Sequence, residues 1–89
     1  MKHHRRDEID IIAAILKCII NINNSKNHKA TKSKIMYGSY LSYTQLTGYL
    51  SLLIKKELIE YQKSEQTFRT TAKGVHYLNV YDGIRRFIQ

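Results

Sequence analysis

The sequence predicts a mostly helical α+β domain, in which three helical segments are followed by a β-hairpin and a last helix. Apolar residues recur at helical spacing from Asp7 to about Ile22. Ser42 stands three residues before Gln45, an arrangement that opens helices. Two short segments rich in β-branched and aromatic residues follow Glu57. At 89 residues the chain is long enough for one small core and too short for two, so we expect one domain.

The first helix is expected to be buried on more than one face, because Ile11 and Ile15 add a second apolar side to it. Its main apolar face comprises Ile9, Ile12, Ala13, Leu16, Ile19 and Ile20. The segment from Asn21 to Asn27 is poor in helix formers and is expected to be the loop that ends it. A second, short helix is predicted from near Thr31 to Gly38.

The third helix begins at Ser42, and its two sides differ in character. With successive residues 100° apart, its apolar side consists of Leu46, Tyr49, Leu50 and Leu53. The opposite side consists of Thr44, Thr47, Gly48, Ser51 and Lys55. That second side is small and polar.

A hairpin and a last helix follow. The predicted strands are Leu58 to Gln62 and Thr67 to Thr71, joined by a polar turn. Thr71 caps a helix that runs to about Ile88, with Gly74 tolerated early in it. Val75, Leu78 and Tyr81 can face the core, and a second apolar stripe on this helix comprises Tyr77, Val80, Ile84 and Phe87. One small domain cannot cover both stripes, so a homodimer is expected through this second stripe.

The charge balance is the unusual feature of the composition. The formal net charge is +8 and the isoelectric point is about 9.8. Between Asp10 and Glu57 the chain has no acidic residue and seven lysines. An acidic partner is favoured, and a DNA duplex is a polyanion. An anionic membrane surface would also suit the charge, but no apolar run approaches the roughly 20 residues of a spanning helix.

The order of helix, helix, helix, hairpin and helix is that of a winged helix, with the hairpin as the wing. Three runs resemble small archaeal winged-helix DNA-binding proteins, including the chromatin-associated group of Sulfolobus. They are Thr31-Lys-Ser-Lys-Ile-Met-Tyr-Gly-Ser-Tyr-Leu-Ser-Tyr, Leu53-Ile-Lys-Lys-Glu-Leu-Ile-Glu-Tyr and Thr70-Thr-Ala-Lys-Gly. The resemblance covers residues 8 to about 82. It implies duplex binding through the third helix and the wing, and dimerisation through a long last helix. The last helix here is shorter than the coiled-coil helix of the chromatin group, which leaves the dimer geometry open.

These observations divide the chain into three parts. We expect a flexible basic N-terminus over residues 1–7, a winged helix-turn-helix domain over residues 8–71, and a dimerisation helix over residues 72–89. Since no signal peptide is recognisable and the lone Cys18 cannot form an internal disulfide, we expect a cytoplasmic protein of the nucleoid. Cys18 itself is expected to lie in the core.

The predicted DNA-binding surface has three components. On the third helix it comprises Ser42, Tyr43, Thr44, Thr47, Gly48, Ser51 and Lys55. Lys26, Lys29, Lys32 and Lys34, before or within the second helix, are assigned to phosphates, and Lys63 and Arg69 are the candidates on the wing. The third helix lacks arginine and asparagine on this side, so strong sequence specificity is not expected.

Most of Tyr37, Tyr40 and Tyr43 should lie in the core, and Tyr43 is favoured as a phosphate donor.

Each of these features also has an interpretation that does not involve DNA. The polar side of the third helix could be a solvated face, and the lysines could serve solubility. A winged helix that binds only protein would expose apolar residues on the third helix, for which Leu52 is the candidate. His3, His4, His28 and His76 lack the spacing of a zinc site, and no motif of an enzyme is present. We therefore expect no metal, no cofactor, no small-molecule substrate and no catalysis. A transcription regulator and a nucleoid protein remain equally open.

Overall fold

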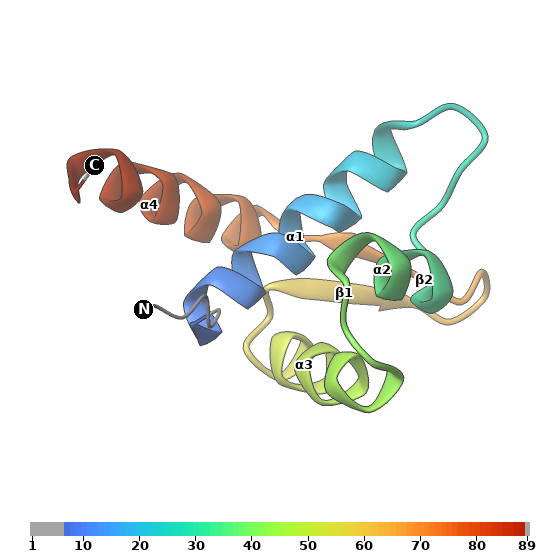
Figure 1. Ribbon diagram of the computed structural model, residues 1–89. Coiled ribbons are helices and arrows are strands. Elements are labelled where there is room, and N and C mark those ends of the chain that lie inside the picture. Colours follow the sequence, from blue (N-terminus) through green and yellow to red (C-terminus); the bar gives the residue numbers. More distant parts are fainter. Residues whose placement is uncertain (1–6, 89) are drawn as a thin grey trace.

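The computed structural model describes residues 7–88, and it has the predicted α+β, mostly helical architecture. The elements follow one another along the chain as α1 (Glu8–Asn24), α2 (Lys32–Ser39), α3 (Tyr43–Lys55), β1 (Ile59–Gln62), β2 (Thr67–Thr70) and α4 (Ala72–Ile88) (Figure 1). The expected flexible segment of residues 1–7 lies, apart from Asp7, outside the described residues, as do His3 and His4. Within the described part, no helix is both long enough and apolar enough to cross a membrane.

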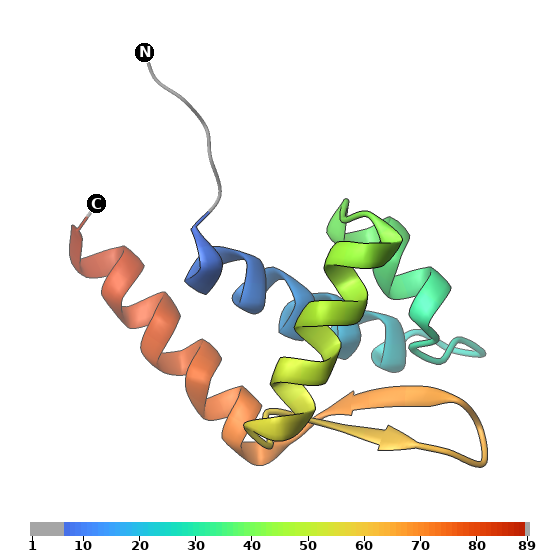
Figure 2. The ribbon, with the colours of Figure 1, turned by 90° about the horizontal axis from the view of Figure 1, so that it is seen from below.

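The core is organised around α1, which contacts α2, α4 and β2. Figure 2 shows α4 extending away from the hairpin, while α3 crosses the view beside α2. As predicted, α1 is buried on more than one face. The side chains with almost no exposed surface include Ile15, Leu16, Ile19, Ile35, Leu46, Leu53 and Ile59, which come from α1, α2, α3 and β1.

The end of α1 differs from the prediction, because the helix continues through Asn21 to Asn24. Asn23 explains the difference. Its side-chain amide donates to the carbonyl oxygen of Phe68 at 2.9 Å, and its side-chain oxygen accepts from the backbone N–H of Ala30 at 2.9 Å. These tertiary hydrogen bonds join α1 to the following loop and to the hairpin, and they outweigh the low helix propensity of asparagine.

Gly38 does not end α2, as the sequence had indicated, since the helix runs to Ser39 and Tyr40 takes the left-handed conformation with φ of 58°. Gly38 instead matters for the packing of α2 against α1. A Cβ atom at Gly38 would lie 2.5 Å from Sγ of Cys18, so the glycine lets α2 approach α1 closely. Cys18 is half-buried rather than fully in the core, and burial raises the pKa of its thiol.

The capping box that opens α3 is confirmed. The backbone N–H of Gln45 donates to Oγ of Ser42 at 3.1 Å, and the N–H of Ser42 donates to Oε1 of Gln45 at 3.0 Å. This reciprocal pair sets where α3 begins and therefore which of its side chains face outward.

The hairpin and the start of α4 also follow the prediction. The strands β1 and β2 pair antiparallel, with Ile59 opposite Thr70 and Gln62 opposite Thr67. The hydroxyl of Thr71 accepts from the backbone N–H of Gly74 at 3.1 Å, as a cap does. Gly74 is required rather than tolerated, since a Cβ atom there would lie 2.4 Å from the carbonyl oxygen of Leu58.

The faces of α4 are partly as predicted. Leu78 is buried, whereas Val75 is 43% exposed, so its assignment to the core face was wrong. The buried Gly74 and Leu78 define the inward face, and Val75 lies about 100° around the helix from Gly74. Tyr77 and Tyr81 pack against α1 and are half-buried, and the Tyr77 hydroxyl donates to the carbonyl oxygen of Ile9 at 2.9 Å.

Candidate nucleic-acid interface

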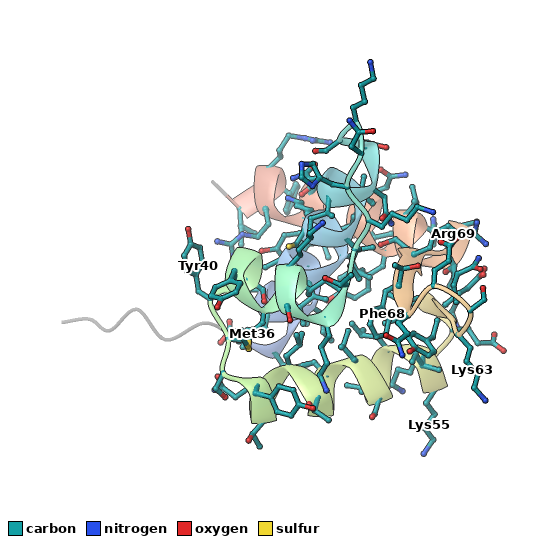
Figure 3. The ribbon with its side chains drawn as sticks, turned by 90° about the vertical axis from the view of Figure 1, so that its right-hand side faces the viewer. Met36, Tyr40, Lys55, Lys63, Phe68 and Arg69 are labelled. Atoms are coloured by element: carbon teal, nitrogen blue, oxygen red, sulfur yellow. The ribbon has the colours of Figure 1, made fainter. Side chains whose placement is uncertain are left out.

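The predicted division of α3 into two sides is present in the structure. Leu46, Leu50 and Leu53 are buried, and Tyr49 is half-buried against them. The residues that are exposed include Ser42 at the cap, then Thr44, Thr47, Gly48, Ser51 and Lys55. Figure 3 shows Lys55 projecting away from the body of the domain. The exposed side of α3 therefore carries short side chains along most of its length.

Gly48 lies in the middle of this exposed side. Beyond its chain neighbours and the backbone of its own helix, an ideal Cβ atom at Gly48 has no heavy atom within 4 Å. A glycine inside an exposed helix costs about 1 kcal/mol relative to alanine. Packing within the described residues therefore does not require a glycine at this position.

Lys32 and Tyr43 connect the start of α2 to the start of α3. The Lys32 ammonium lies 3.9 Å from the centroid of the Tyr43 ring, a cation–π contact. Hydrogen bonding from Lys32, together with its charge, lowers the pKa of the Tyr43 hydroxyl. A phenol with a lowered pKa is a better hydrogen-bond donor, which suits the predicted phosphate contact.

The tyrosines of this region are not in the core, so that prediction was wrong. Tyr37, Tyr40 and Tyr43 are all exposed, and Tyr40 reaches 89%. Figure 3 shows Tyr40 projecting from the turn between α2 and α3. The reason lies in α2, whose buried residues are Ile35 and Ser39. Tyr37 is two residues after Ile35 and thus about 200° away around the helix.

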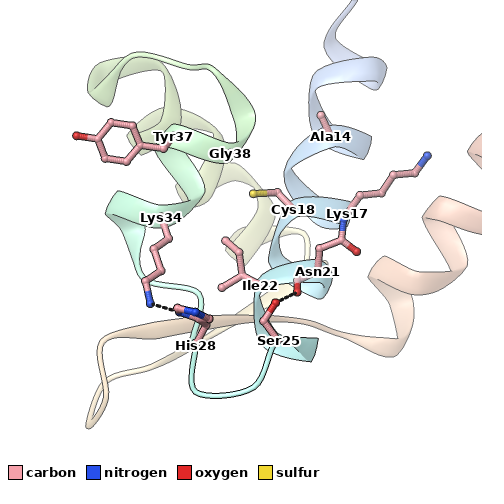
Figure 4. A pocket seen from close by; sticks show the side chains of 10 residues that line it. All are labelled: Ala14, Lys17, Cys18, Asn21, Ile22, Ser25, His28, Lys34, Tyr37 and Gly38. Carbon is pink, nitrogen blue, oxygen red and sulfur yellow. Dashed lines mark hydrogen bonds between the residues drawn. The ribbon is translucent and has the colours of Figure 1, made fainter.

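The lysines near α2 do not form one cluster. Lys34 turns away from α3 toward His28, whose Nδ1 lies 3.3 Å from its Nζ. These two side chains stand at the edge of a groove of about 600 Å³ between α1 and α2, which Cys18 and Tyr37 also line (Figure 4). Lys29 forms an ion pair with Glu65 at 2.9 Å, and Lys26 is exposed in the loop after α1. Of the four lysines, Lys32 is the one in contact with α3.

The wing is nearly balanced in charge. Arg69 on β2 donates to Glu60 on β1 at 2.8 Å, while Lys63 is exposed at the turn (Figure 3). Both ion pairs of the hairpin, Arg69–Glu60 and Lys29–Glu65, are exposed to solvent. Exposed pairs of this kind contribute about 0 to 1 kcal/mol. They can therefore exchange for contacts with a phosphate, but the carboxylates reduce the positive potential of the wing.

A groove of about 500 Å³ separates α3 from the hairpin, and sequence reasoning did not include all of its residues. Thr47, Ser51 and Ile54 line it from α3, and Tyr61 lines it from β1. Ile54 is 41% exposed. Its spacing could have identified it, since Ile54 follows Ser51 by three residues and Thr47 by seven and so shares their side of the helix.

Leu52 does not support a purely protein-binding surface. It is half-buried and packs against the hydrophobic core, so the prediction that it points away from the core was wrong. On the helical wheel it lies at the flank of the exposed side, about 40° from Gly48 and about 60° from the half-buried Tyr49, and from there it packs against the core. Across residues 7–88, no group of three or more potential metal ligands is found.

The comparisons with known proteins agree with this geometry. The winged helix-turn-helix family matches residues 5–89, which is nearly the whole chain. A comparison with curated proteins gives no significant match. The family match, together with the capped α3, the short α2 and the hairpin wing, shows that this chain belongs to the winged helix-turn-helix family.

Proposed function

We propose that this protein binds double-stranded DNA as a homodimer and acts as a transcription regulator or a nucleoid-associated protein. Membership of the winged helix-turn-helix family supports a DNA partner. The observation that carries the proposal is the exposed side of α3, which has short side chains and lies next to the lysine-bearing start of α2. Gly48 lies on this side, and packing within the described residues does not require a glycine there. In helix-turn-helix complexes the second helix enters the major groove and the first crosses the backbone.

Short side chains suit such an approach for a steric reason. A helix comes closest to base edges where its side chains are smallest, and Thr47, Gly48 and Ser51 occupy the centre of the exposed side. Lys32, held over the Tyr43 ring, places a positive charge at the flank of the same side. Phosphates on either side of the major groove would meet these groups.

Salt dependence tests the proposed phosphate contacts. If about five phosphates are neutralised, log affinity should fall with log salt concentration at a slope of about −4 to −5. Fluorescence anisotropy with one labelled duplex between about 50 and 200 mM salt measures the slope. A flat response, or no binding at the lowest salt concentration, would contradict the proposal.

The two roles differ in specificity, and one comparison separates them. The affinity for random duplex is measured beside that for genomic fragments enriched by the protein, at a single salt concentration. A ratio near one supports a nucleoid role. A strong preference for the enriched fragments supports a regulator.

Glu65→Gln should strengthen duplex binding several-fold at low salt. The substitution removes a negative charge from the wing and releases Lys29, which Glu65 holds at 2.9 Å. Anisotropy titrations of the variant and the wild type at two salt concentrations measure the gain, which should shrink as salt rises. Asp82→Gln is the matched control, because Asp82 pairs with Lys17 between α4 and α1. An equal gain in both variants would mean that only net charge matters and that the wing lies away from the DNA.

The homodimer is supported by the exposed apolar surface of α4. Val80 is 49% exposed and Phe87 is 89% exposed, with Ile84 between them. A groove of about 320 Å³, lined mainly by apolar and aromatic side chains of α4 together with Ile9 and Leu58, lies beside them. Beyond its chain neighbours and the backbone of its own helix, an ideal Cβ atom at Gly83 has open space around it, so no side chain stands at this flank of the surface. A second copy of α4 would cover this surface.

A further inference from the structure

We propose that α3 favours duplexes with thymine in the major groove, because the side chains that it presents there bind C5-methyl groups. The inference rests on the proposed function and concerns which bases α3 contacts. The residues that carry it are Thr47 and Ile54, with the small Ser51 between them.

These residues form one surface along the groove between α3 and the hairpin. Thr47 and Ile54 are seven residues apart, which is about two helical turns and returns to nearly the same side of the helix. Ile54 is 41% exposed although it is fully apolar, and Thr47 and Ser51 are exposed beside it. The surface is therefore open to a ligand and carries apolar groups at both ends.

The hydroxyl of Thr47 is already used within α3. It donates to the carbonyl oxygen of Tyr43 at 2.8 Å. Its hydrogen is therefore not available to a base acceptor such as O6 of guanine or O4 of thymine. What Thr47 offers a base is a methyl group and an acceptor oxygen.

The rest of α3 lacks the groups that select the other bases. Guanine and adenine are usually read by bidentate contacts from arginine, lysine, asparagine or glutamine. The helix contains no arginine or asparagine, its one amide, Gln45, is held in the capping box, and its one lysine, Lys55, is the last residue. The C5-methyl group of thymine is the feature of the major groove that remains for apolar contact.

Methyl groups can be removed from the DNA without changing base pairing. Duplexes in which deoxyuridine replaces thymidine should bind more weakly, by about fourfold for each methyl group that α3 buries. Duplexes in which 5-methylcytosine replaces cytosine should bind more tightly, because the added methyl occupies the same position on the pyrimidine ring. Anisotropy titrations with an A·T-rich and a G·C-rich duplex at one salt concentration measure both effects.

A pair of variants at Thr47 separates methyl contact from changes in duplex shape. Thr47→Val keeps a methyl in place and removes the hydroxyl, so the preference for thymine over deoxyuridine should persist. Thr47→Ser removes the methyl and keeps the hydroxyl, so the preference should fall by about fourfold. Ile54→Ala should cause a similar fall. Both residues are exposed, and a thermal melt of each variant checks that the fold is retained.

The outcomes distinguish this inference from the proposed function. If no duplex binds at low salt, DNA binding itself is wrong. If duplexes with and without thymine methyl groups bind the wild type equally, DNA binding stands and the methyl readout is wrong. If Thr47→Ser, Thr47→Val and Ile54→Ala all keep the wild-type preference, that preference comes from duplex shape, and the inference is again wrong.

Discussion

Replacing Gly48 with glutamate should abolish duplex binding and leave the domain folded. Glutamate is a better helix former than glycine, and a Cβ atom at position 48 has open space around it, so the free energy of unfolding should rise by about 0.5 to 1 kcal/mol. A carboxylate at the centre of the exposed side of α3 would oppose the phosphates and fill the space nearest the bases. Juxtaposed like charges cost several kcal/mol, so affinity should fall by at least about a hundredfold.

Two further variants make this result specific. Gly48→Ala adds a methyl group without charge, so it should stabilise the fold and weaken binding less than glutamate does. Asn79→Glu places the same charge on an exposed position of α4, and it should change duplex affinity little beyond the effect of net charge. Thermal melts and anisotropy titrations give the two quantities for each variant. Retained affinity in Gly48→Glu would move the interface away from α3 and favour a protein partner.

The elements whose signals are local were predictable from the sequence. Ser42 and Gln45 are three residues apart, and both reciprocal hydrogen bonds of their capping box form. The start of α3 then fixes the direction of every later side chain, so the buried Leu46, Leu50 and Leu53 followed from helical periodicity. The hairpin followed in the same way from two short β-prone segments on either side of a polar turn.

The parts that depend on distant residues were not predictable. The sequence shows that Asn23 and Gly38 are poor helix formers, but not that Asn23 bonds to Phe68 and Ala30 or that Gly38 faces Cys18. Each of these contacts joins segments that become neighbours only after folding. In both places the helix continues where propensity alone indicated a stop.

The candidate interface likewise has one part that local sequence signals predicted and one part that depends on distant residues. Which side chains of α3 are exposed followed from helical periodicity. The ion pairs of Lys29 with Glu65 and of Arg69 with Glu60 depend instead on the folded position of the hairpin. These ion pairs reduce the positive potential around Lys29 and Arg69, on a wing whose Glu60, Lys63, Glu65 and Arg69 already sum to no net formal charge. The exposed tyrosines were missed because large aromatic residues are usually buried, while here aliphatic side chains fill most of the core.

Charging the apolar stripe of α4 should convert the homodimer into a folded monomer. Fully burying a side chain such as isoleucine or phenylalanine contributes about 1.5 to 3 kcal/mol, and Val80, Ile84 and Phe87 are 49%, 51% and 89% exposed. A symmetric contact buries each of them twice. Ile84→Glu combined with Phe87→Glu would place four carboxylates in that contact and should prevent it.

Loss of the dimer should also weaken DNA binding. Two linked winged helices bind two sites on one duplex, and the gain from this linkage is commonly about a hundredfold or more. The double variant should therefore bind a long duplex at least about a hundredfold more weakly than the wild type, while its affinity for a duplex with room for one domain should fall much less. Sedimentation at micromolar concentration gives the mass, to be compared with 10.5 kDa for one chain.

A matched pair of valines on α4 tests where the contact lies. Val75 is 43% exposed and Val80 is 49% exposed, but they lie on different sides of the helix. Val80→Glu should shift the protein toward monomer, whereas Val75→Glu should leave the dimer intact. Equal effects of the two would mean that charge anywhere on α4 disturbs association and that the stripe is not the interface. A wild-type protein that sediments as a monomer at micromolar concentration would refute the dimer itself, and α3 would then bind DNA from single domains.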